Sequence, residues 1–246
     1  MKHLIALIAC LQLFASCNGQ EGVTQKSKSG LNGSVKKVTN YICPIKKYGE
    51  IPKDTTNYES RTTSTYDSLG NLMEEHSFYQ YNNTITESLT RYSGIGKNRT
   101  FTQKYLSGIE DTTLKSYKYV WSDDYHFKIV PSKRVSESDF TMEYTLDKDF
   151  RIIQSVCKKG ATIQILDEFK YVISSNKVIE KILKRTIEEG ATDRIIHVVT
   201  ISKEYDRYGN PTLTYIYDDP DKQKLGSMSF TIYEYYGEEA THTKTR

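Results

Sequence analysis

Two segments of the sequence share the pattern Tyr-Asp-x-x-Gly-Asn, and each lies between two stretches of strand-forming residues. The pattern residues are Tyr66, Asp67, Gly70 and Asn71 in the first copy, and Tyr205, Asp206, Gly209 and Asn210 in the second. Gly and Asn tolerate the positive φ of a tight hairpin, while the flanking Tyr, Ile, Thr and Leu favour extended backbone. A third, eroded copy covers residues 144–150, where the Gly and the Asn are missing. The repeat therefore predicts a fold built from hairpins.

The rest of the chain shows the same spacing of short apolar segments and turn residues. Early strand candidates are 58–66, 72–81, 85–92 and 101–106, with turn residues between them. Tyr117, Tyr119 and Trp121 fall at alternate positions and share one face, as in a half-buried antiparallel strand. In 177–188 the apolar residues also fit a helix, but flanking turn residues favour a strand. The sequence predicts an antiparallel meander of consecutive hairpins, with no room for crossover helices.

The composition favours an open sheet over a compact sandwich. The 246 residues are 37% hydrophobic with a mean hydropathy of −0.60, and 20 Tyr outnumber 8 Phe and 1 Trp. Tyrosine packs its ring while its hydroxyl stays hydrated, which suits a sheet whose faces are only partly covered. The predicted fold is therefore all-β: an extended, open meander of consecutive hairpins that includes the Tyr-Asp-x-x-Gly-Asn turns.

The N-terminus predicts export. Lys2 precedes an apolar run over 4–14 that is too short to span a bilayer, as in a signal peptide. Residues 14–17, Phe-Ala-Ser-Cys, resemble a lipobox, which implies cleavage after residue 16 and a lipid on Cys17. The alternative is an ordinary signal peptide with an incidental cysteine.

Four regions follow from these features. Residues 1–16 are the predicted lipoprotein signal peptide, and 17–30 are the lipidated cysteine with a polar, flexible tether. Residues 31–237 are the predicted β-meander domain, and 238–246 are a flexible tail.

The YD pattern and the start of the folded region carry a resemblance to a known group. The Tyr-Asp-x-x-Gly-Asn turns resemble the YD repeats of Rhs-like proteins, in the short form found in Bacteroidetes-type lipoproteins. The opening Leu31-Asn32-Gly33-Ser34-Val35-Lys36-Lys37-Val38 is similar to the start of the same group. This resemblance implies an outer-membrane lipoprotein, and leaves the periplasmic and outward faces as alternatives.

The mature chain would keep two thiols in an oxidising compartment, those of Cys43 and Cys157. One disulfide between them would close a long loop and stabilise by roughly 4–5 kcal/mol in the chain-entropy model. Two unpaired, buried cysteines are the alternative.

Candidate sites for chemistry are weak. His76, His126 and His197 lack the spacing of metal ligands, and no nucleophile stands beside a base in the sequence. The acidic run at 218–221 is the best calcium candidate, but it lacks the ligand alternation of a dedicated loop and fits a hairpin tip better. We therefore predict no catalytic residue, no metal and no cofactor. The near balance of 34 basic and 31 acidic residues gives no case for nucleic acid.

The sequence thus favours a non-catalytic, lipid-anchored envelope protein with a binding or scaffold role and a protein or glycan partner. Tyr117, Tyr119 and Trp121 form a candidate aromatic binding surface, with plain cross-strand packing as the alternative. Another class is an envelope glycan hydrolase, which needs two carboxylates brought together in a cleft. A third rests on the Rhs resemblance alone and is an immunity-type protein associated with Rhs-like toxins.

Overall fold

The structure is a computed structural model of the whole chain, and it describes residues 24, 26, 29–45, 50–81, 84–107, 114–133, 140–175, 177–189 and 192–238. Cys17, the signal peptide and residues 239–246 lie outside the described residues. The predicted lipidation therefore stays a prediction.

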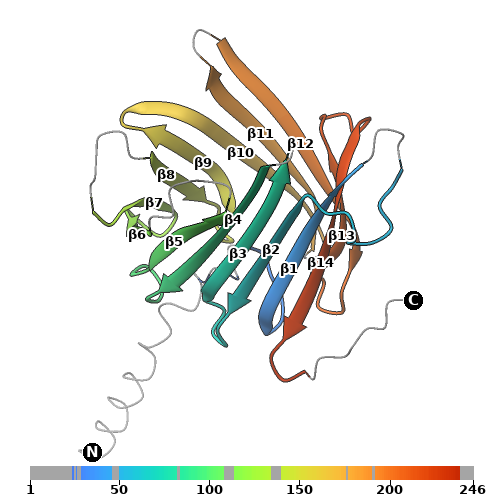
Figure 1. Cartoon of the computed structure of the whole chain (residues 1–246), viewed down its shortest axis with the longest axis horizontal. Helices are drawn as coiled ribbons and strands as arrows, with labels where there is room; N and C mark the ends of the chain where they lie inside the picture. The colour runs from blue at the N-terminus through green and yellow to red at the C-terminus, as the bar shows by residue number, and fades with distance from the viewer. Residues whose placement is uncertain are drawn as a thin grey trace, which may run out of the picture.

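The all-β prediction is confirmed, and the open sheet is wrong. Each strand pairs antiparallel with its neighbours in sequence, as the meander requires, but β1 also pairs with β14 and closes a barrel (Figure 1). The strands are β1 (Val35–Pro44), β2 (Ser60–Tyr66), β3 (Leu72–Tyr81), β4 (Thr84–Ser93), β5 (Thr100–Ser107), β6 (Lys115–Trp121), β7 (His126–Pro131), β8 (Phe140–Leu146), β9 (Ile152–Lys159), β10 (Thr162–Ser174), β11 (Lys177–Glu189), β12 (Thr192–Tyr205), β13 (Pro211–Tyr217) and β14 (Leu225–Tyr235). The strand interpretation of 177–188 is also confirmed, since this segment is β11.

Closure explains the composition that had suggested an open sheet. The β1–β14 ladder runs from Val35 opposite Tyr235 to Pro44 opposite Ser227, so the backbone groups at the two edges of the meander pair with each other. Closing a barrel removes both exposed edges, which a flat sheet leaves unpaired. The half-covered faces that the Tyr-rich composition predicted are the inner faces of this barrel.

The outer wall carries charged pairs between adjacent strands. Because side chains alternate along a strand, residues paired across strands share a face. Four ion pairs are formed by side chains on the outer face: Lys37 with Glu234 (2.9 Å), Arg91 with Glu74 (2.9 Å), Lys158 with Glu143 (2.7 Å) and Lys184 with Glu168 (3.0 Å). The outer wall is thus polar along several strands.

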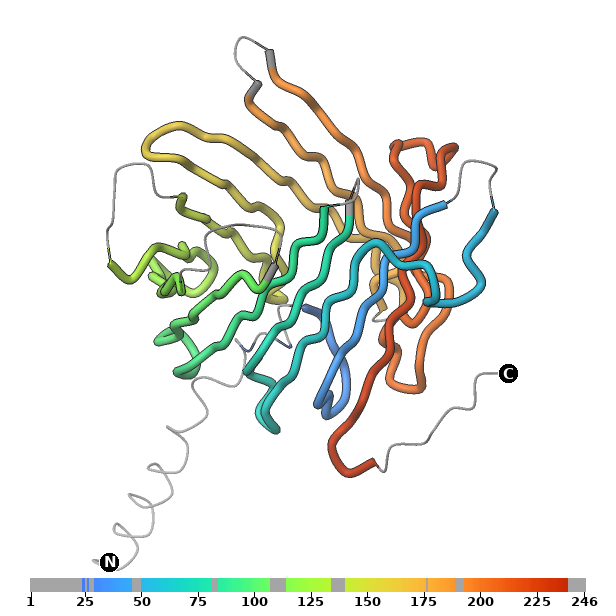
Figure 2. The backbone as a smooth tube through the Cα atoms, viewed as in Figure 1, coloured from blue at the N-terminus to red at the C-terminus, as the bar shows by residue number. Residues whose placement is uncertain are grey.

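The connections divide between the two ends of the barrel. In a closed antiparallel meander, the turns from even to odd strands all lie at one end, which we call the turn end; Figure 2 follows the tube through them. All three YD-type turns lie there, after β2, β8 and β12. The opposite end carries the four longest connections, after β1, β5, β7 and β13, and is called the loop end.

The three YD-type turns have one geometry. In each, an aspartate carboxylate accepts the backbone N–H groups two and four residues later: Asp67 from Leu69 and Asn71, Asp147 from Asp149 and Arg151, and Asp206 from Tyr208 and Asn210. The residue three positions after the aspartate has positive φ in every case: Gly70, Phe150 and Gly209. The third copy predicted from sequence is therefore a true copy, with Phe150 in the place of the glycine.

The chain enters the barrel across the turn end. We call Lys26 and residues 29–34 the strap. The Lys26 backbone N–H donates to the Gly70 carbonyl (3.1 Å), and Asn32 exchanges bonds with the Asn210 side chain (2.8 and 3.0 Å). The strap thus touches both full copies of the YD turn. Its contacts begin at Lys26, inside the range predicted to be a flexible tether.

Candidate functional site

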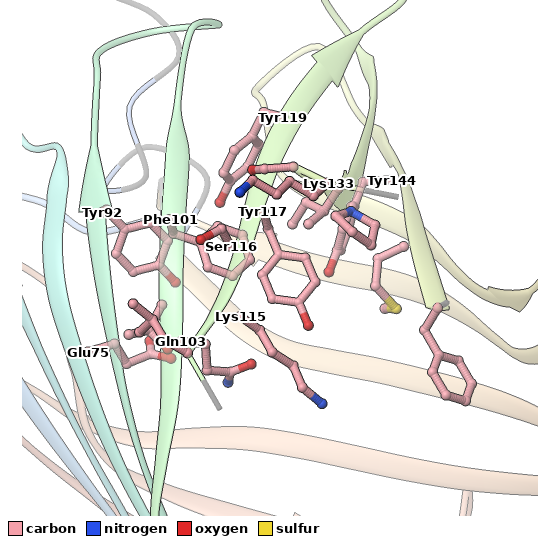
Figure 3. Close-up of a pocket in the computed structure, with 17 residues that line it drawn as sticks. Glu75, Tyr92, Phe101, Gln103, Lys115, Ser116, Tyr117, Tyr119, Lys133 and Tyr144 are labelled. Atoms are coloured by element: carbon pink, nitrogen blue, oxygen red, sulfur yellow. The ribbon is translucent and has the colours of Figure 1, made fainter. Parts of the chain in front are cut away.

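The barrel lumen contains a pocket of about 1040 Å³, at the upper end of the volumes usual for small-molecule sites (Figure 3). It lies between β3 and β8, on the inner face of these strands. The lining residues are Glu75, Thr90, Tyr92, Phe101, Gln103, Leu114, Lys115, Ser116, Tyr117, Tyr119, Ile129, Pro131, Ser132, Lys133, Phe140, Met142 and Tyr144.

Two neighbouring rows of side chains form the wall over β3–β6. The aromatic row consists of Tyr92, Phe101 and Tyr117. Phe101 is the cross-strand partner of Tyr92 on one side and of Tyr117 on the other. The Phe101 ring stacks on Tyr117 with centroids 4.8 Å apart and contacts Tyr92 at 5.3 Å. Figure 3 shows these three rings side by side. They offer a continuous apolar surface to the lumen.

The second row is polar and consists of Glu75, Thr90, Gln103 and Lys115, again paired strand to strand. It lies one inward position, about 7 Å, from the aromatic row, on the side of the loop end. Leu114, Ser132 and Lys133 lie just outside their strands at the loop end and form the rim of the pocket. A ligand entering there meets the polar row before the aromatic row.

Glu75 is the acidic member of the lining. Its Oε2 accepts a hydrogen bond from the Ser64 hydroxyl (3.2 Å). Burial raises the pKa of the Glu75 carboxyl, and the bond from Ser64 offsets only part of that effect. Burial also raises the pKa of Tyr92, and the nearby Glu75 charge adds to it. The carboxyl thus lies beside aromatic rings in a poorly hydrated part of the lumen.

An apolar cluster closes the turn end beneath this pocket. Val35, Tyr66, Leu72 and Tyr235 are its buried members; Leu31 of the strap and Tyr92 of the pocket wall pack against them. Arg99, which is 1% exposed, lies beside this cluster. Its guanidinium donates to the Leu72 carbonyl and lies 5.4 Å from the Tyr92 ring centroid. The floor of the lumen is therefore packed, and the pocket opens toward the loop end.

The predicted aromatic surface is only partly the site. Tyr117 and Tyr119 line the pocket as members of β6. Trp121 is on the same inward face, where its ring packs against Phe127 with centroids 4.6 Å apart, outside the pocket lining. These aromatics face the lumen and not an outer surface. In β6, Tyr117 and Tyr119 therefore line the pocket, while Trp121 packs across strands.

Sequence reasoning missed most of the wall. Glu75, Tyr92, Phe101, Gln103 and Tyr144 were not identified as site residues, because alternation gives the two faces of a strand but not which strands come together. The signal was present for β5 and β6, where alternating aromatics occur in consecutive strands. Glu75, inside Glu74-Glu75-His76, carried no such signal.

The calcium candidate and two of the histidines form hydrogen bonds within or between strands and turns. The described residues contain no group of three or more His, Cys, Asp or Glu placed to hold a metal ion. At the β13–β14 connection, the Asp219 carboxylate accepts the backbone N–H groups of Gln223 (3.0 Å) and Lys224 (2.6 Å), as in a hairpin tip. His76 bonds to Glu87 on the outer wall (2.7 Å), and His126 bonds to Asp123 in its own turn (2.8 Å).

The possible disulfide between Cys43 and Cys157 is not formed, and both residues are free cysteines, as in the alternative. Cys43 belongs to β1 and Cys157 to β9, which are far apart in the strand order of the barrel. Cys157 pairs with Met142 and faces the lumen, whereas Cys43 is buried beside the loop after β1. Even through the closing β1–β14 ladder, five strands lie between β1 and β9, which sequence spacing could not reveal.

The comparisons with known proteins leave the family open, since no protein-family model and no curated protein matches this sequence. No helix among the described residues is long and apolar enough to cross a membrane.

Proposed function

We propose that this chain is a lipid-anchored cell-envelope protein that binds an amphipathic small molecule in the lumen of its barrel, without catalysing a reaction. The observation that carries this proposal is the pocket of about 1040 Å³ walled by an aromatic row and a polar row. This is the usual chemistry of a binding site, in which apolar lining supplies affinity and a few polar groups fix orientation.

The two rows favour a ligand with an apolar and a polar part. The apolar body would lie against Tyr92, Phe101 and Tyr117, toward the packed floor. The polar part would reach Gln103 and its neighbours, toward the loop end. Burying a flat apolar group against these rings releases about 25 cal/mol per Å² of apolar surface, which supplies the driving force.

The polar outer wall supports attachment through a lipid and not through the barrel itself. Ion pairs such as Glu143 with Lys158 favour a wall in contact with water, because the cost of removing two charged groups from water can exceed their mutual attraction. From Cys17 to Lys26 the chain spans at most about 30 Å when fully extended. A lipid on Cys17 would therefore hold the turn end near the membrane, with the pocket opening away from it.

The glycan hydrolase alternative gains no support from this pocket. Its mechanism needs two carboxylates about 5–9 Å apart, and Glu75 is the one carboxylate among the lining residues described.

The binding proposal is tested by filling the pocket without removing its walls. Gln103→Phe places a ring in the polar row, and Thr102→Phe places the same ring on the outer face of the same strand as a matched control. The probe is the neutral amphipathic dye N-phenyl-1-naphthylamine, whose fluorescence rises in apolar sites. We expect saturable binding to the wild type and to Thr102→Phe, with at least a tenfold weaker affinity in Gln103→Phe. Equal binding by all three proteins would refute a lumenal site.

The anchor is tested separately in cells. Metabolic labelling with a palmitate analogue should mark the wild type and leave Cys17→Ser unlabelled. Labelling of Cys17→Ser to the wild-type level would refute the predicted anchor without affecting the binding proposal.

A further inference from the structure

The lumen pocket combines one buried carboxyl with a set of aromatic faces. Glu75 has the Ser64 hydroxyl as its hydrogen-bond donor, and no ion pair of Glu75 with a basic side chain occurs in the described part of the chain. This distinguishes it from Asp167, an acidic residue elsewhere on the inner wall, which Arg185 binds through two nitrogens at 2.7 and 2.8 Å. Glu75 therefore has spare acceptor capacity facing the pocket.

We infer that the ligand of this pocket is an organic cation, an amine or quaternary ammonium on an apolar body, whose charged group lies between Glu75 and the aromatic row. The inference rests on the proposed function, because it names the class of ligand for the same site. An ammonium group placed there neutralises the carboxylate and meets the negative faces of the rings.

The geometry allows both contacts at once. Glu75 is the cross-strand partner of Thr90, and Tyr92 is the next inward residue of β4. Successive inward residues of a strand are about 7 Å apart, and a cation interacts with a ring when it lies within about 6 Å of the centroid. Figure 3 shows Glu75 beneath the Tyr92 ring and next to Gln103, on the same wall. One ammonium group therefore spans the gap between the two rows.

The positive groups of the lining do not occupy this position. Lys115 lies three strands from Glu75 along the polar row, about 14 Å away at the usual strand spacing. Lys133 is exposed at the rim. A cation bound beside Glu75 thus lies at the acidic end of the row, with Lys115 at the opposite end and Lys133 at the rim.

The test uses three ligands with the same body and different charge: 4-phenylbutyltrimethylammonium, 4-phenylbutanol and 4-phenylbutanoate. Their affinities are measured by displacement of N-phenyl-1-naphthylamine from the full chain and by the emission of Trp121, the single tryptophan of the chain. We expect the cation to bind at least tenfold more tightly than the alcohol and the carboxylate to bind most weakly.

The variants are Glu75→Gln and, as the matched control, Glu74→Gln. Glu74 is the preceding residue of β3 and pairs with Arg91 on the outer wall. Glu75→Gln should bring the cation to within twofold of the alcohol and leave the affinity for the alcohol unchanged within twofold. Glu74→Gln should behave as the wild type.

The outcomes separate the two proposals. If the alcohol displaces the dye and the cation binds no more tightly, the inference on charge is overturned and lumenal binding stands. If the cation is preferred to the same extent by Glu75→Gln, Glu75 is not the recognition group and the inference is also overturned. If neither the dye nor any of the three ligands binds, both proposals fall.

Discussion

The contact between the strap and the second YD turn gives the sharpest prediction on stability. Asn210 is 0% exposed, and its side chain makes four hydrogen bonds. It accepts from the Asn32 N–H (2.8 Å) and donates to the Asn32 carbonyl (3.0 Å), the Tyr235 hydroxyl (2.7 Å) and, within its own turn, the Asp206 carboxylate (3.4 Å). Asn210→Ala removes all four. Neither Asn210 nor Asn71 has positive φ, so alanine introduces no backbone strain at either position.

The first YD turn supplies the matched control. Asn71 is also buried, but its side chain bonds within its own turn, to the Asp67 carboxylate (2.9 Å). With about 1 kcal/mol for each net hydrogen bond, Asn210→Ala should lower the free energy of unfolding by about 4 kcal/mol and Asn71→Ala by about 1 kcal/mol. At about 2–4 °C per kcal/mol for a chain of this size, the melting temperatures should fall by about 8–16 °C and 2–4 °C.

The assay is urea denaturation followed by circular dichroism, with hydrogen exchange of the peptide that contains residues 29–34. Asn210→Ala should lose protection in this peptide, whereas Asn71→Ala should keep it. The reasoning is refuted if the two variants lose equal stability, or if the strap stays protected in Asn210→Ala. Either result would mean that the strap is held by Lys26 and Leu31 without the Asn210 bonds.

Three further predictions concern the turns, the inner ion pair and pH. Gly209→Ala should cost about 1–2 kcal/mol because alanine must adopt φ +85°; Phe150→Gly at the equivalent position should stay within about 1 kcal/mol of the wild type, since relief of strain at φ +60° offsets the lost Tyr125 stacking. Arg185→Met should destabilise by about 2–3 kcal/mol because it leaves the buried Asp167 carboxylate unpaired, and adding Asp167→Asn should recover most of that loss in the same denaturation assay. Burial raises the pKa of Glu75 above its ordinary value of 4.5, so the native state retains this proton better than the unfolded state does. The resulting stabilisation is complete well below pH 4.5 and is lost as pH rises through the native pKa. Glu75→Gln should therefore gain stability relative to the wild type as pH rises above 4.5; Ser64, Tyr66 and Tyr92 are the polar and titratable groups near Glu75, and Lys115 lies about 14 Å away. A gap between the two proteins that stays constant with pH in urea titrations would contradict this assignment.

Local features of the fold were predictable because short-range chemistry determines them. The YD turns were identified from Asp, Gly and Asn, and the structure gives their mechanism: one carboxylate accepts two backbone N–H groups while the residue before the last takes positive φ. The eroded copy was found although Phe150 stands in the place of glycine, because Asp147 keeps the bonds that define the turn. The meander order followed from the same hairpins.

Closure and the site were not predictable in this way, because both depend on which distant strands meet. β1 and β14 are separated by almost the whole chain, and nothing within either strand specifies its partner. Glu75 sits in the middle of a polar run, and it becomes a site residue only because Ser64, Thr90 and the aromatic row share its face in the closed barrel. Tyr117 and Tyr119 were identified as candidates, but their surroundings come from β4, β5 and β8.

The low hydropathy of the chain follows from this architecture and connects the fold to the proposed function. A barrel whose outer wall carries ion pairs and whose lumen contains an open pocket has two faces in contact with water, so few of its apolar residues are buried. One cluster of them closes the turn end, where Val35, Tyr66, Leu72 and Tyr235 pack beneath the pocket and Leu31 of the strap packs against them. Tyr92 belongs both to the pocket wall and to the residues packed on this cluster. Loosening the strap should therefore disturb the packing of Tyr92 in the aromatic row. Asn210→Ala should weaken binding of a lumenal ligand although Asn210 does not line the pocket.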